Sequence, residues 1–332
     1  MTSVETGEDY VRLVASLAPP GTNSPQAIDA TNAVWDEWEA AGFARGPDTR
    51  EVIEDPNRIF VAYYNDIITA NRLGKHPVHY CYAKTGDLNA YASTTANGDY
   101  VIVFDSDFHR LINGIVIPAI VCVYSKPSDD DVEFYFSYML EEIAQFKEQK
   151  NAFANPEDFT KIILKDYELT MLGSYCGAAI YAYIICHELA HHLAGHTSTS
   201  RKMAISSSRN YMTHISVNNT SHNEEFEADC LGYKLYTNIP KDYDKLENLK
   251  LNTQFLSLPL AFFDLLKIID NLFPSEGLTH PAPPERLERL QQYKKQLRLD
   301  EDTEFYDALT EVLNGFATWC GNKQIKRNVN QK

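Results

Sequence analysis

Two histidines four residues apart enclose a glutamate in the segment His187-Glu188-Leu189-Ala190-His191. On a helix, residues at this spacing lie one turn apart on the same face, so both imidazoles can bind one metal ion. Glu188 lies about 100° around the helix from His187 and can reach a metal-bound water without displacing it. Imidazole and carboxylate ligands suit zinc, which lowers the pKa of such a water to roughly 7. The segment therefore predicts metal-assisted hydrolysis with Glu188 as general base.

A third ligand is predicted on an acidic helix further along the chain. Glu225 and Asp229 are one turn apart in the segment Asn223-Glu224-Glu225-Phe226-Glu227-Ala228-Asp229. We expect Glu225 to bind one Zn2+ ion per chain together with the two histidines, and Asp229 to hydrogen-bond a ligand histidine from behind. Glu224 is the alternative ligand. Glu224 and Glu227 are otherwise typical of a solvated acidic face.

The residues that follow the two histidines do not supply the third ligand. Gly195 and His196 are one residue out of step with an extended three-histidine motif. On an uninterrupted helix, His196 would also point nearly opposite His187. We expect Gly195 to end the helix and His196 to cap its C-terminus.

An oxyanion formed during hydrolysis needs a hydrogen-bond donor besides zinc. The sequence offers several candidates for this donor or for a substrate contact: His280, Tyr211, His214, His222 and Tyr233. A histidine in such a position is as compatible with packing or capping as with catalysis.

The elements that must position these side chains are mainly helical. Aromatic and β-branched segments between turn signals predict a small antiparallel sheet from residues 79–83, 89–92 and 100–104. Helical patterns cover residues 132–150, 159–172, 175–194, 223–236, 254–271 and 284–297. Residues 197–221 are rich in serine, threonine and asparagine and predict a mobile loop. The fold class expected is α+β, mainly α.

Composition limits the partners and the compartment. The 332 residues include 30 Lys+Arg and 46 Asp+Glu, so the formal charge is -16. An acidic surface does not attract phosphate backbones or anionic lipids, so we expect a polypeptide partner and no nucleic acid. Six cysteines without short pair spacings indicate reduced thiols in a cytoplasmic protein. The N-terminus does not resemble a signal peptide, and the most apolar run, 111–124, is too short to span a membrane and predicts a core segment.

Together these segments resemble a gluzincin metallopeptidase, closest to the family of the CAAX prenyl proteases and the heat-shock membrane zinc proteases. Leu88-Asn89-Ala90-Tyr91-Ala92, followed by Tyr100-Val101-Ile102-Val103-Phe104, is similar to the strand pair that precedes the zinc helix in that family. Thr279-His280-Pro281, followed by Glu285-Arg286-Leu287, is similar to its Thr-His-Pro segment. A soluble zincin of the phage-exclusion type is the alternative relative.

The resemblance implies roles for individual residues. His187, His191 and Glu225 would be the zinc ligands and Glu188 the general base. An edge strand formed by Asn89, Ala90, Tyr91 and Ala92 would bind an extended substrate by β-augmentation. The expected division is an N-terminal helical region at 1–75, a zincin-like metallopeptidase domain at 76–297 with an insertion at about 113–175, and a C-terminal helix and tail at 298–332.

The function expected from the sequence is that of a soluble zinc-dependent endopeptidase. The alternative is a zinc-stabilised peptide-binding or sensor module, or a latent defence or stress protease, with little constitutive cleavage. A filled fourth coordination position would indicate the binding module, whereas a general base such as Glu188 favours the enzyme. The sequence leaves the oligomeric state open.

Overall fold

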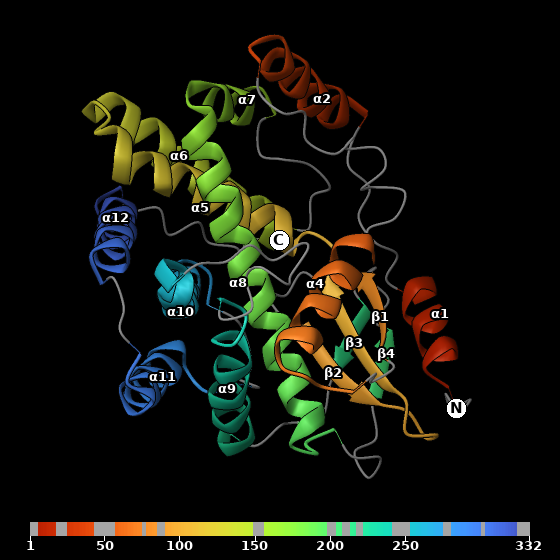
Figure 1. Ribbon diagram of the computed structural model, residues 1–332. Coiled ribbons are helices and arrows are strands. Elements are labelled where there is room, and N and C mark those ends of the chain that lie inside the picture. The colour runs from red at the N-terminus through yellow and green to blue at the C-terminus, as the bar shows by residue number, and fades with distance from the viewer. Residues whose placement is uncertain are drawn as a thin grey trace.

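Helices form most of the protein, and a small sheet stands beside them (Figure 1). The computed structural model describes residues 6–17, 25–42, 57–74, 78–84, 90–148, 156–197, 204–207, 213–216, 222–240, 253–274, 280–299 and 303–323. The helices are α1 (Gly7–Leu17), α2 (Pro25–Ala40), α4 (Asn57–Ala70), α5 (Phe108–Ser125), α6 (Asp129–Lys147), α7 (Pro156–Lys165), α8 (Tyr167–Leu193), α9 (His222–Tyr236), α10 (Leu258–Leu272), α11 (Pro283–Leu297) and α12 (Thr303–Asn322). The mainly helical α+β class expected from the sequence is confirmed.

Among the described residues, three strands form one sheet: β1 (Val78–Ala83), β2 (Ala90–Thr94) and β3 (Tyr100–Asp105). β3 is in the centre. It runs antiparallel to β2, with Ala92 opposite Ile102, and parallel to β1. The sheet is therefore mixed, and the prediction of an antiparallel sheet is wrong for the pair of β1 and β3.

β3 takes the central place because both of its faces are apolar. Val101 and Val103 belong to a cluster with α1, which covers one face of the sheet. Ile102 and Phe104 belong to the main core on the other face, where α4 and α8 pack. A strand buried on both faces is most stable with a neighbouring strand on each side. The prediction of an antiparallel sheet followed the order of the strands in the chain and did not include this burial.

The long helix α8 runs through the middle of the molecule, between the sheet and the C-terminal helices (Figure 1). It begins where Asp166 caps it, because this carboxylate accepts a hydrogen bond from Leu169 N at 3.0 Å. The predicted helices at 159–172 and 175–194 divide the chain at the wrong place. The helical periodicity did not reveal the single capping aspartate.

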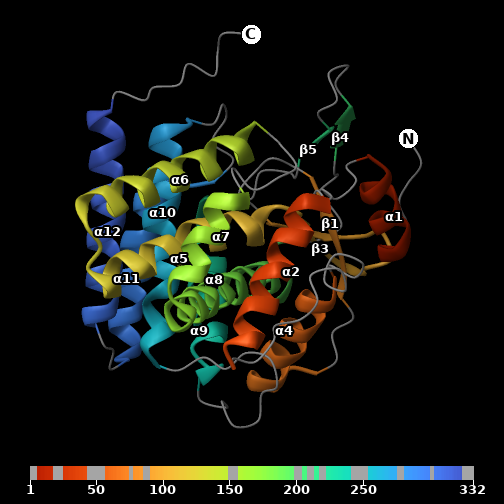
Figure 2. The ribbon, with the colours of Figure 1, turned by 90° about the horizontal axis from the view of Figure 1, so that it is seen from above.

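α5, α9 and α10 pack against α8. α11 packs on α9 and α10, and α12 packs on α5 and α10. From above, α2 and α7 are seen side by side (Figure 2), and they share an apolar cluster around Trp38, Tyr135 and Phe159. The short 3-10 helix Thr253–Ser257 leads into α10.

The segment 197–221 contains regular structure within its described part. β4 (Ala204–Ser207) and β5 (Thr213–Ser216) pair in antiparallel fashion, with Ile205 opposite Ile215. The prediction of a loop is therefore wrong for these two strands. Residues 198–203, 208–212 and 217–221, like the tail at 324–332, lie outside the described residues.

Two helices of the described chain, α5 and α8, are long and apolar enough to cross a membrane by length and composition. A buried core helix passes the same test, and 61% and 72% of the two apolar windows are buried inside the protein. The predicted core segment 111–124 lies in α5, which is longer than the apolar run, so the prediction that it is too short to span a membrane is wrong by length. The absence of a membrane span stays a prediction.

Candidate metal centre

The last two turns of α8 bring His187 and His191 together on one buried face. Their Nε2 atoms are 3.1 Å apart, and the two rings meet edge to face with centroids 4.7 Å apart. This arrangement follows from the helix itself, because residues four apart lie one above the other. Both imidazoles therefore present a nitrogen to the same point.

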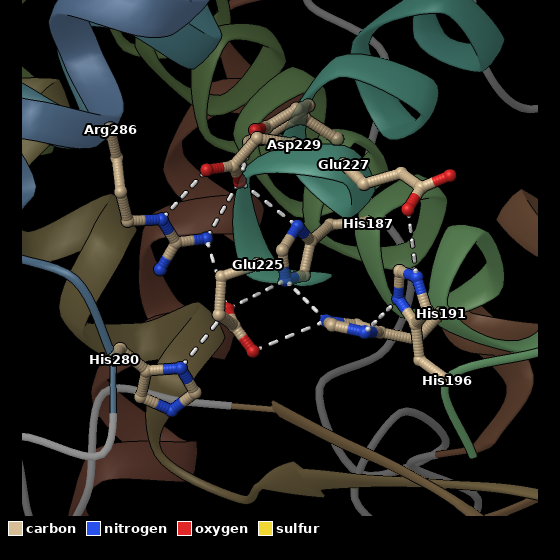
Figure 3. Close-up of polar contacts among 9 residues, drawn as sticks. His187, His191, His196, Glu225, Glu227, Asp229, His280 and Arg286 are labelled. Carbon is tan, nitrogen blue, oxygen red and sulfur yellow. Dashed lines mark hydrogen bonds and ion pairs between the residues drawn. The ribbon is translucent and has the colours of Figure 1, made fainter. Parts of the chain in front are cut away.

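Glu225, in the first turn of α9, presents its carboxylate to that point (Figure 3). Its Oε2 lies 3.6 Å from Nε2 of His187, and its Oε1 lies 3.5 Å from Nε2 of His191. α9 comes this close to α8 because Gly232 has no side chain: a Cβ there would lie 2.8 Å from the Cα of His187. Within the described chain, these three residues form the group of potential ligands, with donor atoms within 4.8 Å of one another, and Glu224 is not a member. The cluster can hold one metal ion.

Asp229 lies one turn after Glu225 and behind His187. Its Oδ1 is 3.0 Å from Nδ1 of His187, and the hydroxyl of Tyr183 donates to it at 3.1 Å. Arg286 of α11 donates from Nε to Oδ2 at 2.8 Å and from Nη2 to Oδ1 at 2.7 Å. This two-pronged pairing fixes the carboxylate, which in turn fixes the ring of His187.

His280 lies three residues before the start of α11 and beside Glu225. Its Nδ1 is 3.0 Å from Oε2 of Glu225, and 30% of its side chain is exposed. The imidazole is therefore at the solvent-facing side of the cluster. Thr279, which precedes it in the predicted motif, is outside the described residues.

His196 lies against His191, and the prediction that the helix ends at Gly195 is confirmed. α8 ends at Leu193, and Gly195 has a φ of +77°, which reverses the chain. Nδ1 of His196 lies 3.1 Å from Nδ1 of His191, and its Nε2 lies 3.2 Å from Oε2 of Glu227. Because the helix stops before position 196, the side chain of His196 turns back toward His191.

Glu188 follows His187 on α8 and is buried near the sheet. Its carboxylate accepts a hydrogen bond from the backbone N–H of Ala92 in β2. Burial raises the pKa of Glu188 to about 7, although the nearby His187 lowers it. A carboxyl group that titrates near neutral pH can both accept and release a proton.

β2 lies beside Glu188 at an edge of the sheet, where β3 is its neighbour among the described strands. Ala90, Tyr91 and Ala92 belong to this strand, whereas Asn89 lies outside the described residues. The strand thus brings a backbone edge next to the buried carboxylate.

Tyr233 and His222 are the remaining candidates for an oxyanion donor whose side chains the structure describes. Tyr233 is buried, and its hydroxyl donates to the carbonyl oxygen of Leu256 at 3.0 Å, which engages it in packing. His222 is exposed at the start of α9. His214 belongs to β5, and Tyr211 lies outside the described residues.

Comparison with known proteins identifies the class. A family model described as Peptidase U49 matches residues 125–309, more than half of the chain. The chain belongs to the Peptidase U49 family. All of the clustered residues from His187 to Arg286 lie inside the match, whereas the three-stranded sheet of β1, β2 and β3 lies before it. No curated protein and no solved structure matched the chain. The U49 family implies a peptidase that acts on polypeptides.

The cluster of this U49 peptidase balances its charges internally. Burial lowers the pKa of His187, but Asp229 and Glu225 outweigh it and raise the pKa to about 10. Burial and the neighbouring His187 lower the pKa of His191 to about 2. Burial opposes ionisation of Glu225, but its contact with His187 and nearby cations hold its pKa far below the usual range. In the metal-free protein, a proton on His187 thus supplies the positive charge that a metal ion would supply.

Sequence reasoning missed three residues that support the cluster of the U49 peptidase. Arg286 was noted within a resemblance but without a role, and His196 was predicted as a helix cap without its contact to His191. His192 joins α8 to the sheet: its ring stacks on Tyr100 at 4.3 Å, and its Nε2 lies 3.3 Å from the carbonyl oxygen of Val101. His192 could have been noticed in the sequence because it is a third histidine directly after the motif. The contact of His196 could have been considered because Gly195, a residue typical of helix ends, precedes it.

Proposed function

We propose that this U49 peptidase is a zinc-dependent endopeptidase of the gluzincin type, in which His187, His191 and Glu225 bind one Zn2+ ion. The observation that carries the proposal is the spacing of the donor atoms. In a tetrahedral site with zinc–ligand distances of about 2.0–2.1 Å, neighbouring donor atoms lie roughly 3.4 Å apart. In the protein the two Nε2 atoms are 3.1 Å apart, Oε1 of Glu225 is 3.5 Å from Nε2 of His191, and its Oε2 is 3.6 Å from Nε2 of His187. Two imidazoles and a carboxylate are also a known donor set of catalytic zinc.

The number of ligands supports an enzyme over a zinc-stabilised binding or sensor module. Catalytic zinc sites keep a fourth position for water or substrate, whereas structural sites fill it with protein. In the described part of the chain, the ligand group has three members. A structural site also has no use for a general base, yet Glu188 follows directly after His187.

The proposed chemistry assigns each group a task. When bound, zinc supplies a Lewis acid that polarises water and the scissile carbonyl. Glu188 takes a proton from the attacking water as the water oxygen bonds to the carbonyl carbon. It then passes this proton to the amine nitrogen as the C–N bond breaks. Burial disfavours the ionised form of Glu188, which supports its ability to hold the proton between the two transfers. Asp229 keeps Nε2 of His187 directed at the metal, and His280 or Tyr211 is the proposed donor to the oxyanion or the substrate.

The proposed substrate is an extended polypeptide that pairs with the edge strand. β2 supports this role because Ala92 binds Glu188 and therefore places the strand beside the base. Backbone pairing with residues 89–92 would recognise unfolded or exposed segments with little regard for side chains. We place the activity in the cytoplasm, since the six cysteines are unpaired.

The proposal is tested by incubating zinc-loaded protein with reduced casein and comparing wild type with Glu188→Gln. We expect cleavage by wild type and a loss of about 100-fold or more in the variant, with zinc content unchanged. Glu168→Gln is the matched control, because it makes the same substitution at the exposed start of the same helix. It should cleave like wild type.

Two results would overturn the proposal of an endopeptidase. Equal cleavage by wild type and Glu188→Gln would show that another protein in the preparation cuts casein. No cleavage by wild type with zinc bound would favour the binding module. Replacing His187 by alanine should remove zinc, which ties the metal content to the cluster.

A further inference from the structure

His191 is part of a chain of contacts that ends at the protein surface (Figure 3). Its Nδ1 lies 3.1 Å from Nδ1 of His196, and Nε2 of His196 lies 3.2 Å from Oε2 of Glu227. The His196 side chain is 6% exposed, whereas the Glu227 side chain is 65% exposed. A surface carboxylate thus reaches a potential metal ligand through one buried imidazole.

The contacts define where the hydrogens lie when both histidines are neutral. Nε2 of His191 faces the other donor atoms of the cluster, so a metal ion takes its lone pair and the hydrogen is on Nδ1. This N–H donates to Nδ1 of His196. The hydrogen of His196 is then on Nε2 and donates to the Glu227 carboxylate. Each of the ring nitrogens of His191 and His196 then has one partner: the metal ion, the other ring or the Glu227 carboxylate.

The end of α8 builds this arrangement. The N–H of Gly195 donates to the carbonyl oxygen of His192 at 3.1 Å, and the N–H of His196 donates to that of His191 at 2.9 Å. These are the paired hydrogen bonds of a Schellman turn, with glycine in the left-handed position. The turn folds the ring of His196 back against the ring of His191, with centroids 5.2 Å apart.

We propose that His196 and Glu227 are positioning residues that hold His191 in the tautomer and orientation required for metal binding. This inference rests on the proposed metal site. The two histidines of the cluster are then held differently: His187 directly by the buried Asp229, and His191 by an exposed glutamate through a second imidazole. Partners that orient metal-binding histidines change metal affinity or activity by about 10–100-fold.

Glu227 permits a test that leaves the core intact, because its side chain is mostly exposed. The Zn2+ dissociation constant is measured by competition with a chromogenic chelator for full-length wild type, Glu227→Ala, Glu227→Gln, His196→Ala and the double alanine variant. We expect Glu227→Ala to weaken zinc binding about tenfold. Glu227→Gln keeps an acceptor oxygen and should recover most of the affinity. Circular dichroism checks that each variant is folded.

The double variant distinguishes positioning from a general charge effect. If Glu227 acts through His196, removing it from His196→Ala protein should weaken zinc binding no further. Glu288→Ala removes the same charge from α11, where Glu288 is exposed and accepts a hydrogen bond from Gln292, and should bind zinc like wild type. The proposal is overturned if Glu227→Ala keeps wild-type affinity, if its effect adds fully to His196→Ala, or if Glu288→Ala has the same effect.

The peptidase assay keeps the two proposals separate. For a peptide substrate, Glu227→Ala should lower kcat with little change in KM. A wild type that binds zinc but leaves the peptide intact would refute the endopeptidase, while the zinc affinities would still decide the role of Glu227. A wild type without affinity for zinc would refute both.

Discussion

Arg286 holds Asp229 with two hydrogen bonds of 2.8 and 2.7 Å, and the same carboxylate lies 3.0 Å from Nδ1 of His187. A guanidinium on α11, a carboxylate on α9 and an imidazole on α8 therefore form one buried row. Arg286 also lies over the ring of Phe263, with its Cζ 4.9 Å from the centroid. The row ties the orientation of His187 to the packing of three helices.

Replacing Arg286 by methionine is expected to destabilise the protein by about 3–5 kcal/mol, because the buried carboxylates Asp229 and Glu225 then share the single positive charge of His187. Urea unfolding at neutral pH measures this loss. Arg289→Met is the matched control on the same helix. Arg289 is exposed over the ring of Phe226, at 3.6 Å from the centroid, so its loss should cost no more than about 1 kcal/mol. Equal losses in the two variants would contradict the role given to Arg286.

The cluster itself was predictable because its determinants are local. A spacing of four on a helix fixes the relation of His187 to His191, and of Glu225 to Asp229, whatever the rest of the chain does. Spacing alone does not tell which distant group meets each pair. Arg286 reaches Asp229 only because α11 packs on α9, a contact that no periodicity in the sequence encodes.

The failures have the same origin. The end of the helix at Gly195 was predicted, but the contact of His196 was not, because the local pattern does not tell that the reversed chain lays this ring against His191. The order of the strands depends on β3 being buried on both faces. That burial requires α1 to pack on one face of the sheet and α4 and α8 to pack on the other. The residue pattern of a single strand does not show which helices will cover it or which strands will pair with it.

Zinc binding is expected to tighten as the pH rises. In the metal-free protein, Asp229 and Glu225 outweigh burial and raise the pKa of His187 to about 10, so a metal ion must displace a proton below that pH. Release of one proton predicts a change in affinity of about tenfold per pH unit around neutrality. Titration with a chelator at several pH values measures the slope. Asp229→Asn removes a charge that retains the proton and should flatten it, whereas a slope of zero in wild type would contradict this account.

Stability is expected to fall on the acid side because of His192. Burial lowers its pKa from 6.5 to about 4, so between these values the unfolded chain binds more protons than the folded one. The contribution of neutral His192 is therefore complete above pH 6.5 and decreases toward pH 4, by about 2 kcal/mol at pH 5. His192→Gln keeps polar atoms for Thr197 and Val101 but cannot titrate. Urea unfolding of both proteins at several pH values should show a smaller loss in the variant, and parallel losses would exclude His192 as the cause.

Gly232→Ala is expected to damage the metal site without touching a ligand. A Cβ at position 232 would lie 2.8 Å from Cα and 2.9 Å from N of His187, and backbone atoms of α8 cannot move aside as a flexible side chain can. α9 must then shift away from α8 and carry Glu225 with it. We expect a loss of about 1–3 kcal/mol in stability, together with weaker zinc binding.

Gly315→Ala is the matched control in α12, where the nearest atom to a new Cβ is 3.7 Å away on the ring of Phe136. That substitution should be neutral or stabilise the helix by up to about 1 kcal/mol. If both variants bind zinc like wild type, the close approach of α9 to α8 is not what sets the distance between Glu225 and the two histidines.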